Sequence, residues 1–147
     1  MFKKSHLKEY CKFLLKEENL QEAVRLNIQF ARNHASGLLK TLEPLSDEKM
    51  EELFKVTFGK FIKDLSEGKG LDNIIGSFNQ WKANNYGLQG AITPTDIILA
   101  FMIRKDVLIQ LIPTFTDNHG INLSIRDELD AFFLIASKTG MQYTGGV

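Results

Sequence analysis

The spacing of apolar residues predicts helices along almost the whole chain. In each segment the apolar side chains recur every three or four positions, which is the period of a helix with one buried face. The pattern indicates six helices, at about residues 2–18, 20–42, 46–67, 71–82, 93–112 and 121–140. No stretch alternates between apolar and polar residues for long enough to predict a strand. We therefore expect a single all-α domain over residues 1–147.

Residues that favour helix ends support several of these boundaries. Asn19 is a candidate N-cap for the second helix, and Pro44 follows the expected end of that helix. Ser46, followed by two acidic residues, favours the start of the third helix, and Gly68 favours its end. Thr93-Pro94 has the pattern of an N-cap followed by proline at the first helical position.

The helix predicted at 93–112 is apolar on most of its surface and yet carries two cations, Arg104 and Lys105. Because residues 97–103 are all apolar, we expect this helix to be buried on most sides. A cation there requires an anion, a hydrogen-bonding partner or a path to water. Each side chain can extend its charged end to solvent or lie at the rim of a dimer interface. Alternatively, one of the two holds an anionic group inside the fold.

Composition narrows the possible functions. Eighteen Lys and Arg residues balance eighteen Asp and Glu residues, and this zero net charge argues against a general nucleic-acid-binding protein. The single cysteine, Cys11, excludes an intrachain disulfide and shares a helix face with leucines, so we expect it to be buried. The chain has no recognisable signal peptide and no apolar run long enough to span a membrane. We therefore expect a soluble, cytoplasmic protein.

No motif for catalysis, metal binding or haem binding is present. The chain has no phosphate-binding loop, no His-Glu-x-x-His sequence and no paired metal-ligand spacing. Its three histidines are His6, His34 and His119, and none lies in the third or fourth predicted helix, where a globin would carry its haem ligands. We therefore expect neither an enzyme nor a haem protein.

The helix predicted at 20–42 carries a second set of candidate binding residues. His34 shares the apolar face of this helix with Asn27, and small residues nearby leave space. Two polar side chains on one apolar face can bind the head group of a ligand. Equally, they can be core residues with hydrogen-bond partners inside the protein, as most buried polar groups are.

Eleven phenylalanines, most of them on the predicted inward faces, indicate a large core. A phenylalanine-rich interior also suits a long apolar ligand. The residues that we predict to bind such a ligand, by tail or by head group, are Asn27, Phe30, His34, Phe54, Phe58, Phe101, Arg104, Lys105 and Leu108.

The order of the helices, the missing haem ligand and two sequence segments resemble a known family. The segments are Leu71-Asp-Asn-Ile-Ile-Gly-Ser-Phe-Asn-Gln-Trp81 and Thr93-Pro-Thr-Asp-Ile-Ile-Leu99. Together with the helix order, they resemble the non-haem globin sensor domains of spore-forming bacilli. Those domains occur at the N-terminus of sporulation sensor histidine kinases and as free-standing sporulation-inhibitory proteins. The resemblance extends over essentially the whole chain and rests on the overall pattern.

This resemblance implies a globin-like fold without haem and a homodimer formed through the two C-terminal helices. It also implies a cavity for a fatty acid, with a halide such as chloride as a co-ligand. A free-standing member would inhibit sporulation by diverting the signal or the ligand from the related kinase. The chain fits that type, because it carries no kinase region after Gly140. The resemblance assigns no individual ligand residue.

A ligand-free function is the alternative. The same apolar C-terminal helices could serve as an interface that binds a partner kinase directly, with no cavity and no fatty acid.

Overall fold

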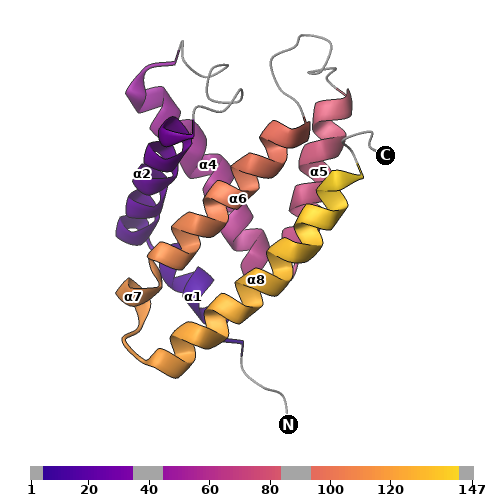
Figure 1. Cartoon of the computed structure of the whole chain (residues 1–147). Coiled ribbons are helices and arrows are strands. Elements are labelled where there is room, and N and C mark those ends of the chain that lie inside the picture. The colour runs from indigo at the N-terminus through magenta and orange to yellow at the C-terminus, as the bar shows by residue number, and fades with distance from the viewer. Residues whose placement is uncertain (1–4, 35–44, 84–93, 143–147) are drawn as a thin grey trace.

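A computed structural model of the chain describes residues 5–34, 45–83 and 94–142. The described residues form an all-helical structure in which the helices cross one another around a shared core (Figure 1). Six helices have nine or more residues, and a four-residue helix, α7, accompanies them in this part of the chain, so the predicted all-α fold of about six helices is confirmed. Their bounds are α1 His6–Leu14, α2 Glu17–Asn33, α4 Asp47–Ser66, α5 Gly70–Ala83, α6 Pro94–Gln110, α7 Ile112–Phe115 and α8 His119–Met141.

Three of the predicted helix boundaries are confirmed. The Ser46 hydroxyl accepts a hydrogen bond from the Lys49 backbone N–H at 3.2 Å and caps α4. Gly68 follows the end of α4 with φ of +76°, a conformation that glycine adopts without strain. Helix α6 begins at Pro94, as the sequence predicts, while the proposed cap at Thr93 lies outside the described residues.

The prediction that Asn19 caps the second helix is wrong. Helix α1 ends at Leu14 and α2 already begins at Glu17, so Asn19 lies within the first turn of α2. Its side-chain amide donates a hydrogen bond to the Phe13 carbonyl at 2.9 Å, which satisfies an acceptor at the end of α1. Asn19 therefore fixes the turn between the two helices.

The predicted end of the second helix is also wrong. Helix α2 ends at Asn33, and His34 is its C-terminal cap, with its backbone N–H bonded to the Phe30 and Ala31 carbonyls. Residues 35–42, which the sequence pattern assigned to the same helix, lie outside the described residues.

Helix α6 is the element around which the others pack. It contacts α2, α5, α7 and α8, and Figure 1 shows it crossing in front of α4. Its side chains are buried on several faces, and the buried set is Ile97, Phe101, Ile103, Val107 and Leu108. This agrees with the expectation that a helix apolar on most of its surface is covered on most sides.

Aromatic side chains connect α6 to two of its neighbours. The Phe61 ring of α4 lies 5.4 Å from the Phe101 ring of α6, between centroids, and 6.1 Å from the Phe133 ring of α8. These are the separations of favourable tilted ring pairs. Phe61 therefore joins three helices at the centre of the core.

A buried tyrosine fixes α1 against the end of α6. Tyr10 is fully buried, and its hydroxyl donates a hydrogen bond of 2.5 Å to the Leu108 carbonyl. Leu108 lies in the last turn of α6, where helical carbonyls run out of partners within the helix. Burial raises the pKa of Tyr10 above its ordinary value, so the hydroxyl remains a donor throughout the physiological range.

No helix in the described part of the chain is both long enough and apolar enough to cross a membrane.

We expect Tyr10→Phe to lower the free energy of unfolding by about 1–2 kcal/mol, because the Leu108 carbonyl loses a buried donor. Equilibrium denaturation in urea measures this change. Thr114→Val is the control, since it removes an exposed hydroxyl that also bonds a carbonyl, and it should change the free energy by less than about 0.5 kcal/mol. Equal effects of the two substitutions would show that the buried bond has no special role.

Candidate functional site

Arg104 lies over the rings of three phenylalanines. Its guanidinium carbon is 4.9 Å from the centroid of Phe101, 5.4 Å from that of Phe61 and 5.7 Å from that of Phe58. Phe101 precedes Arg104 by three residues on α6, and Phe58 and Phe61 are likewise three apart on α4, so each helix presents its residues on one face. Cation–π attraction, about 0.5–2 kcal/mol for a single pair, offsets part of the cost of taking the guanidinium out of water.

Within the described residues Arg104 has no ion pair and no hydrogen-bond acceptor. Burial lowers the pKa of Arg104 to about 10, because the surroundings solvate its charge poorly. The side chain still carries its proton at neutral pH. The site therefore holds a positive charge that the aromatic rings stabilise only in part.

The Arg104 side chain borders an open groove between α4 and α5. The groove has a volume of about 570 Å³. Most of the residues that line it are polar or charged. They are Val56, Thr57, Lys60 and Asp64 of α4, Asp72, Asn73, Gly76, Ser77 and Gln80 of α5, and Lys69 between the two helices. Arg104 comes from α6, so three helices contribute to this groove.

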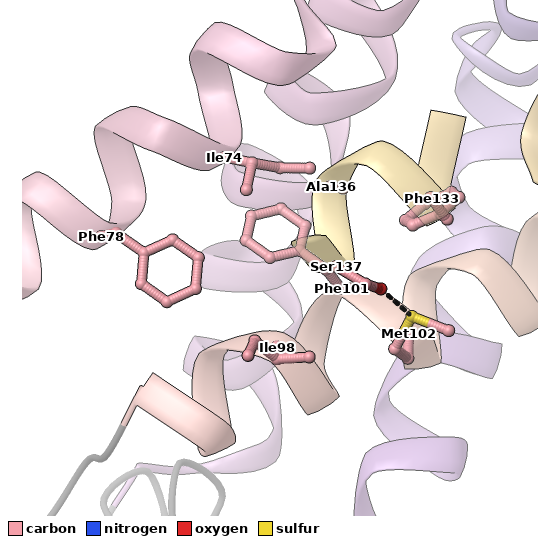
Figure 2. Close-up of a pocket in the computed structure, with 8 residues that line it drawn as sticks. All are labelled: Ile74, Phe78, Ile98, Phe101, Met102, Phe133, Ala136 and Ser137. Carbon is pink, nitrogen blue, oxygen red and sulfur yellow. Dashed lines mark hydrogen bonds between the residues drawn. The ribbon is translucent and has the colours of Figure 1, made fainter. Parts of the chain in front are cut away.

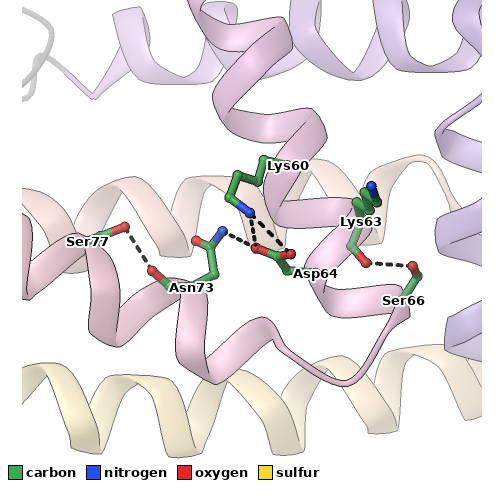
Figure 3. A network of polar contacts seen from close by, with 6 residues as sticks. All are labelled: Lys60, Lys63, Asp64, Ser66, Asn73 and Ser77. Carbon is green, nitrogen blue, oxygen red and sulfur yellow. Dashed lines mark hydrogen bonds and ion pairs between the residues drawn. The ribbon is translucent and has the colours of Figure 1, made fainter.

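A network of polar contacts joins the two walls of the groove (Figure 3). The Asp64 carboxylate of α4 accepts a hydrogen bond of 2.8 Å from the Asn73 side chain of α5 and forms an ion pair of 3.2 Å with Lys60. Hydrogen bonding from Asn73, followed by the charges of Lys60 and Lys69, lowers the pKa of Asp64. The Ser77 hydroxyl donates to the Asn73 carbonyl at 3.1 Å. Asp64 is therefore ionised and held by partners other than Arg104.

Lys105, the other cation of α6, already has a partner. Its Nζ lies 2.9 Å from Oδ1 of Asp130 on α8, and its side chain is only 20% exposed. Adjacent residues of a helix point about 100° apart. Lys105 consequently joins α6 to α8, whereas Arg104 points toward α4 and the groove.

A small apolar void also borders Phe101 (Figure 2). Its volume is about 10 Å³, enough for about one water molecule, and much too small for an acyl chain. Side chains of α5, α6 and α8 line it, namely Ile74, Phe78, Ile98, Phe101, Met102, Phe133, Ala136 and Ser137. The Ser137 hydroxyl lies 3.6 Å from the Met102 sulfur, which is its acceptor. Phe101 thus borders both the void and the Arg104 guanidinium.

The predicted ligand-binding residues lie in several places. Phe58, Phe101 and Arg104 come together, as described above. Phe30 and Phe54 are half-buried and pack against the core, Leu108 is fully buried, and its carbonyl accepts the Tyr10 bond. These positions give the apolar candidates a role in the core.

The two polar candidates on α2 differ from each other. Asn27 is buried, with 5% of its surface exposed. His34 is exposed at the end of α2, so the prediction that it lies on a buried apolar face is wrong. The cause is the end of the helix at Asn33, because the helical spacing that placed His34 inward stops there.

Sequence reasoning missed Phe61 and the polar walls of the groove as site residues. Phe61 follows Phe58 by three positions, which is a signal that two rings share one helix face. No sequence pattern indicated Asp64, Asn73 and Ser77, because their proximity to Arg104 depends on how α4 and α5 pack.

The described residues support neither a reactive cysteine nor a metal site. Burial raises the pKa of Cys11 to about 12, so its thiol is protonated at neutral pH and is not an activated nucleophile. In residues 5–34, 45–83 and 94–142, no cluster of three or more His, Cys, Asp or Glu side chains could hold a metal ion.

Comparison of the chain with protein-family models, with curated proteins and with solved structures finds no match.

We expect Arg104→Met to leave the free energy of unfolding unchanged or to raise it by up to about 1 kcal/mol. Methionine keeps the apolar contacts of the arginine stem, and replacing a poorly solvated charge with an apolar group is often neutral or stabilising. Chemical denaturation of the ligand-free protein measures the effect.

Lys105→Met is the matched control, since it breaks a partly exposed ion pair and should cost about 0–1 kcal/mol. A loss of more than about 1 kcal/mol in Arg104→Met would instead mean that the arginine is there to stabilise the fold.

Proposed function

We propose that this protein is a cytoplasmic fatty-acid-binding sensor with a globin-like fold and no haem. The acyl chain would lie among the aromatic and aliphatic side chains of α5, α6 and α8, and Arg104 would bind the carboxylate. The observation that carries this proposal is the position of Arg104, a cation over three phenylalanine rings with no ion pair among residues 5–34, 45–83 and 94–142. One of those rings, Phe101, also lines the apolar void.

The two parts of such a ligand would make different contributions. Each buried methylene contributes roughly 0.8 kcal/mol, so a long chain gains most of its affinity from apolar contacts. An arginine–carboxylate pair is commonly bidentate and adds orientation as well as energy. The void of about 10 Å³ would have to widen, which requires α5 to move relative to α6 and α8. The cost of that movement would be offset by the buried chain.

This movement gives the domain a means of signalling without catalysis. A ligand that binds one packing of α5 more tightly than the other shifts the population toward it. As a homodimer related to a sporulation kinase sensor, the protein would inhibit sporulation by removing the ligand or the signal. A halide such as chloride is a smaller anion that could occupy Arg104 in place of a carboxylate.

An exposed apolar surface on α8 supports a second candidate function, the binding of another protein. Helix α8 exposes several large apolar side chains, with exposed fractions of 59% for Leu134, 53% for Ile135 and 62% for Met141. Exposed apolar side chains gathered on one helix are typical of protein interfaces. The face could form the homodimer, or it could bind a partner kinase directly without a ligand.

We expect protein purified under native conditions to release a stoichiometric fatty acid when it is denatured and extracted for mass spectrometry. Arg104→Gln should reduce the retained amount at least fivefold, because the carboxylate loses its cation. Ala136→Leu should reduce it to a similar extent, because the larger side chain fills the space where the void would widen.

Two matched controls accompany these variants. Lys105→Gln removes the neighbouring cation, and Ala131→Leu adds the same side chain on the exposed face of α8, so both should retain the fatty acid. An empty extract that stays empty after incubation with oleate would contradict fatty-acid binding and favour the interaction module.

For the α8 face, we expect the double variant Leu134→Lys/Ile135→Lys to convert a homodimer into a monomer in sedimentation equilibrium. Two desolvated lysines would oppose association at an apolar interface. Gln21→Lys/Gln29→Lys adds the same charge at exposed positions of α2 and should leave the association unchanged. An unaltered dimer in the first variant would exclude α8 as the interface.

A further inference from the structure

The open groove between α4 and α5 gives an ion from solvent access to the partly buried Arg104 side chain. Arg104 contributes a guanidinium with five N–H donors, none of which has an acceptor within the described residues. The three rings contact the guanidinium, but they carry no negative charge that would neutralise it. An anion in the groove would therefore meet a positioned donor group without any movement of the helices.

The charged residues of the groove have a net charge of +1. Lys60, Lys69 and Arg104 are cations, and Asp64 and Asp72 are anions. Asp64 cannot simply neutralise Arg104, because Lys60 and Asn73 already hold its carboxylate. A bound ion with one negative charge would bring the net charge of the groove to zero. A second negative charge on the ion would be repelled by Asp64 and Asp72 and would have no further cation to pair with.

The size of the groove also distinguishes it from the void. At about 570 Å³ it has room for a carboxylate and several attached carbon atoms, and it is open to solvent. The void holds only about 10 Å³ and is lined mainly by apolar side chains. A short, water-soluble anion can consequently use the groove alone.

We propose that the α4–α5 groove is a binding site for a singly charged oxyanion, a carboxylate, with Arg104 as the binding residue and Asp64 and Asp72 as the residues that exclude doubly charged ions. For its natural ligand this inference rests on the proposed function, because a fatty acid carries such a carboxylate. It adds the place where the head group binds, on the α4–α5 face, and the charge that the site selects. The site does not require the acyl chain.

The test is a titration of the full chain with sodium butyrate and, separately, with sodium sulfate in a zwitterionic buffer. Two-dimensional NMR reports the Arg104 Nε–H signal and the backbone amides of the groove. We expect saturable shifts with butyrate that include the Arg104 signal, and binding of sulfate at least tenfold weaker. Asp72 is exposed, so Asp72→Asn should fold normally. It should reduce the ratio of butyrate affinity to sulfate affinity by at least threefold.

Arg104→Gln should weaken butyrate binding at least tenfold, while Lys105→Gln should bind it as the unaltered protein does. Unchanged butyrate binding in Arg104→Gln would overturn the assignment of the site. Sulfate binding as tight as butyrate binding would overturn the charge selection. Asp64→Asn provides a second measurement of that selection and should likewise favour sulfate relative to butyrate.

The outcomes separate this inference from the proposed function. If butyrate binds at Arg104 but no fatty acid is ever retained, the anion site stands and the acyl-chain sensor fails. If fatty acid is retained while Arg104→Gln has no effect and butyrate does not bind, the anion site fails and the sensor stands.

Discussion

The need to bury α6 is the constraint on which the rest of the structure depends. This helix is apolar around most of its circumference, and apolar surface removed from water contributes roughly 25 cal/mol per Å². Helices α2, α5 and α8 cover it, and α4 covers it through aromatic side chains. Tyr10 of α1 reaches its last turn and fixes it there. The crossing arrangement follows, since one helix can be covered on several sides only by partners that approach from different directions.

The two cations of α6 show how a buried helix can accommodate charge in two ways. Lys105 points toward α8 and is neutralised by Asp130. Arg104 points toward α4, where phenylalanines stabilise it without neutralising it. A fold selected only for stability would have little reason to keep an arginine that has no ion pair in the described part of the chain beside three rings, because an apolar residue fills the same space without the desolvation cost. This contrast between neighbouring residues is the reason for proposing Arg104, and not Lys105, as the binding residue.

The sequence predicted the helices well, because helical periodicity is a local property. For the same reason it predicted that α6 is buried on most sides and that Phe58 and Phe101 lie on inward faces. It was wrong about Asn19, because α1 ends at Leu14 and α2 begins at Glu17, both earlier than the pattern suggested. It was wrong about His34, because the helical period was extended past the residue where α2 ends. The groove beside Arg104 could not be predicted, since Asp64 and Asn73 approach it only through the packing of α4 against α5.

The difference in size between the groove and the small apolar void has a consequence for any ligand with a charged head and an apolar tail. On the proposed function, the head would bind Arg104 while the core is still packed, and the tail would enter only after the helices that line the void repack. Binding would therefore occur in two steps, first with a small electrostatic gain and then with a larger apolar gain offset by repacking. Only the second step alters the helices. A short anion would bind without generating a signal, and the length of the acyl chain would decide whether the domain responds.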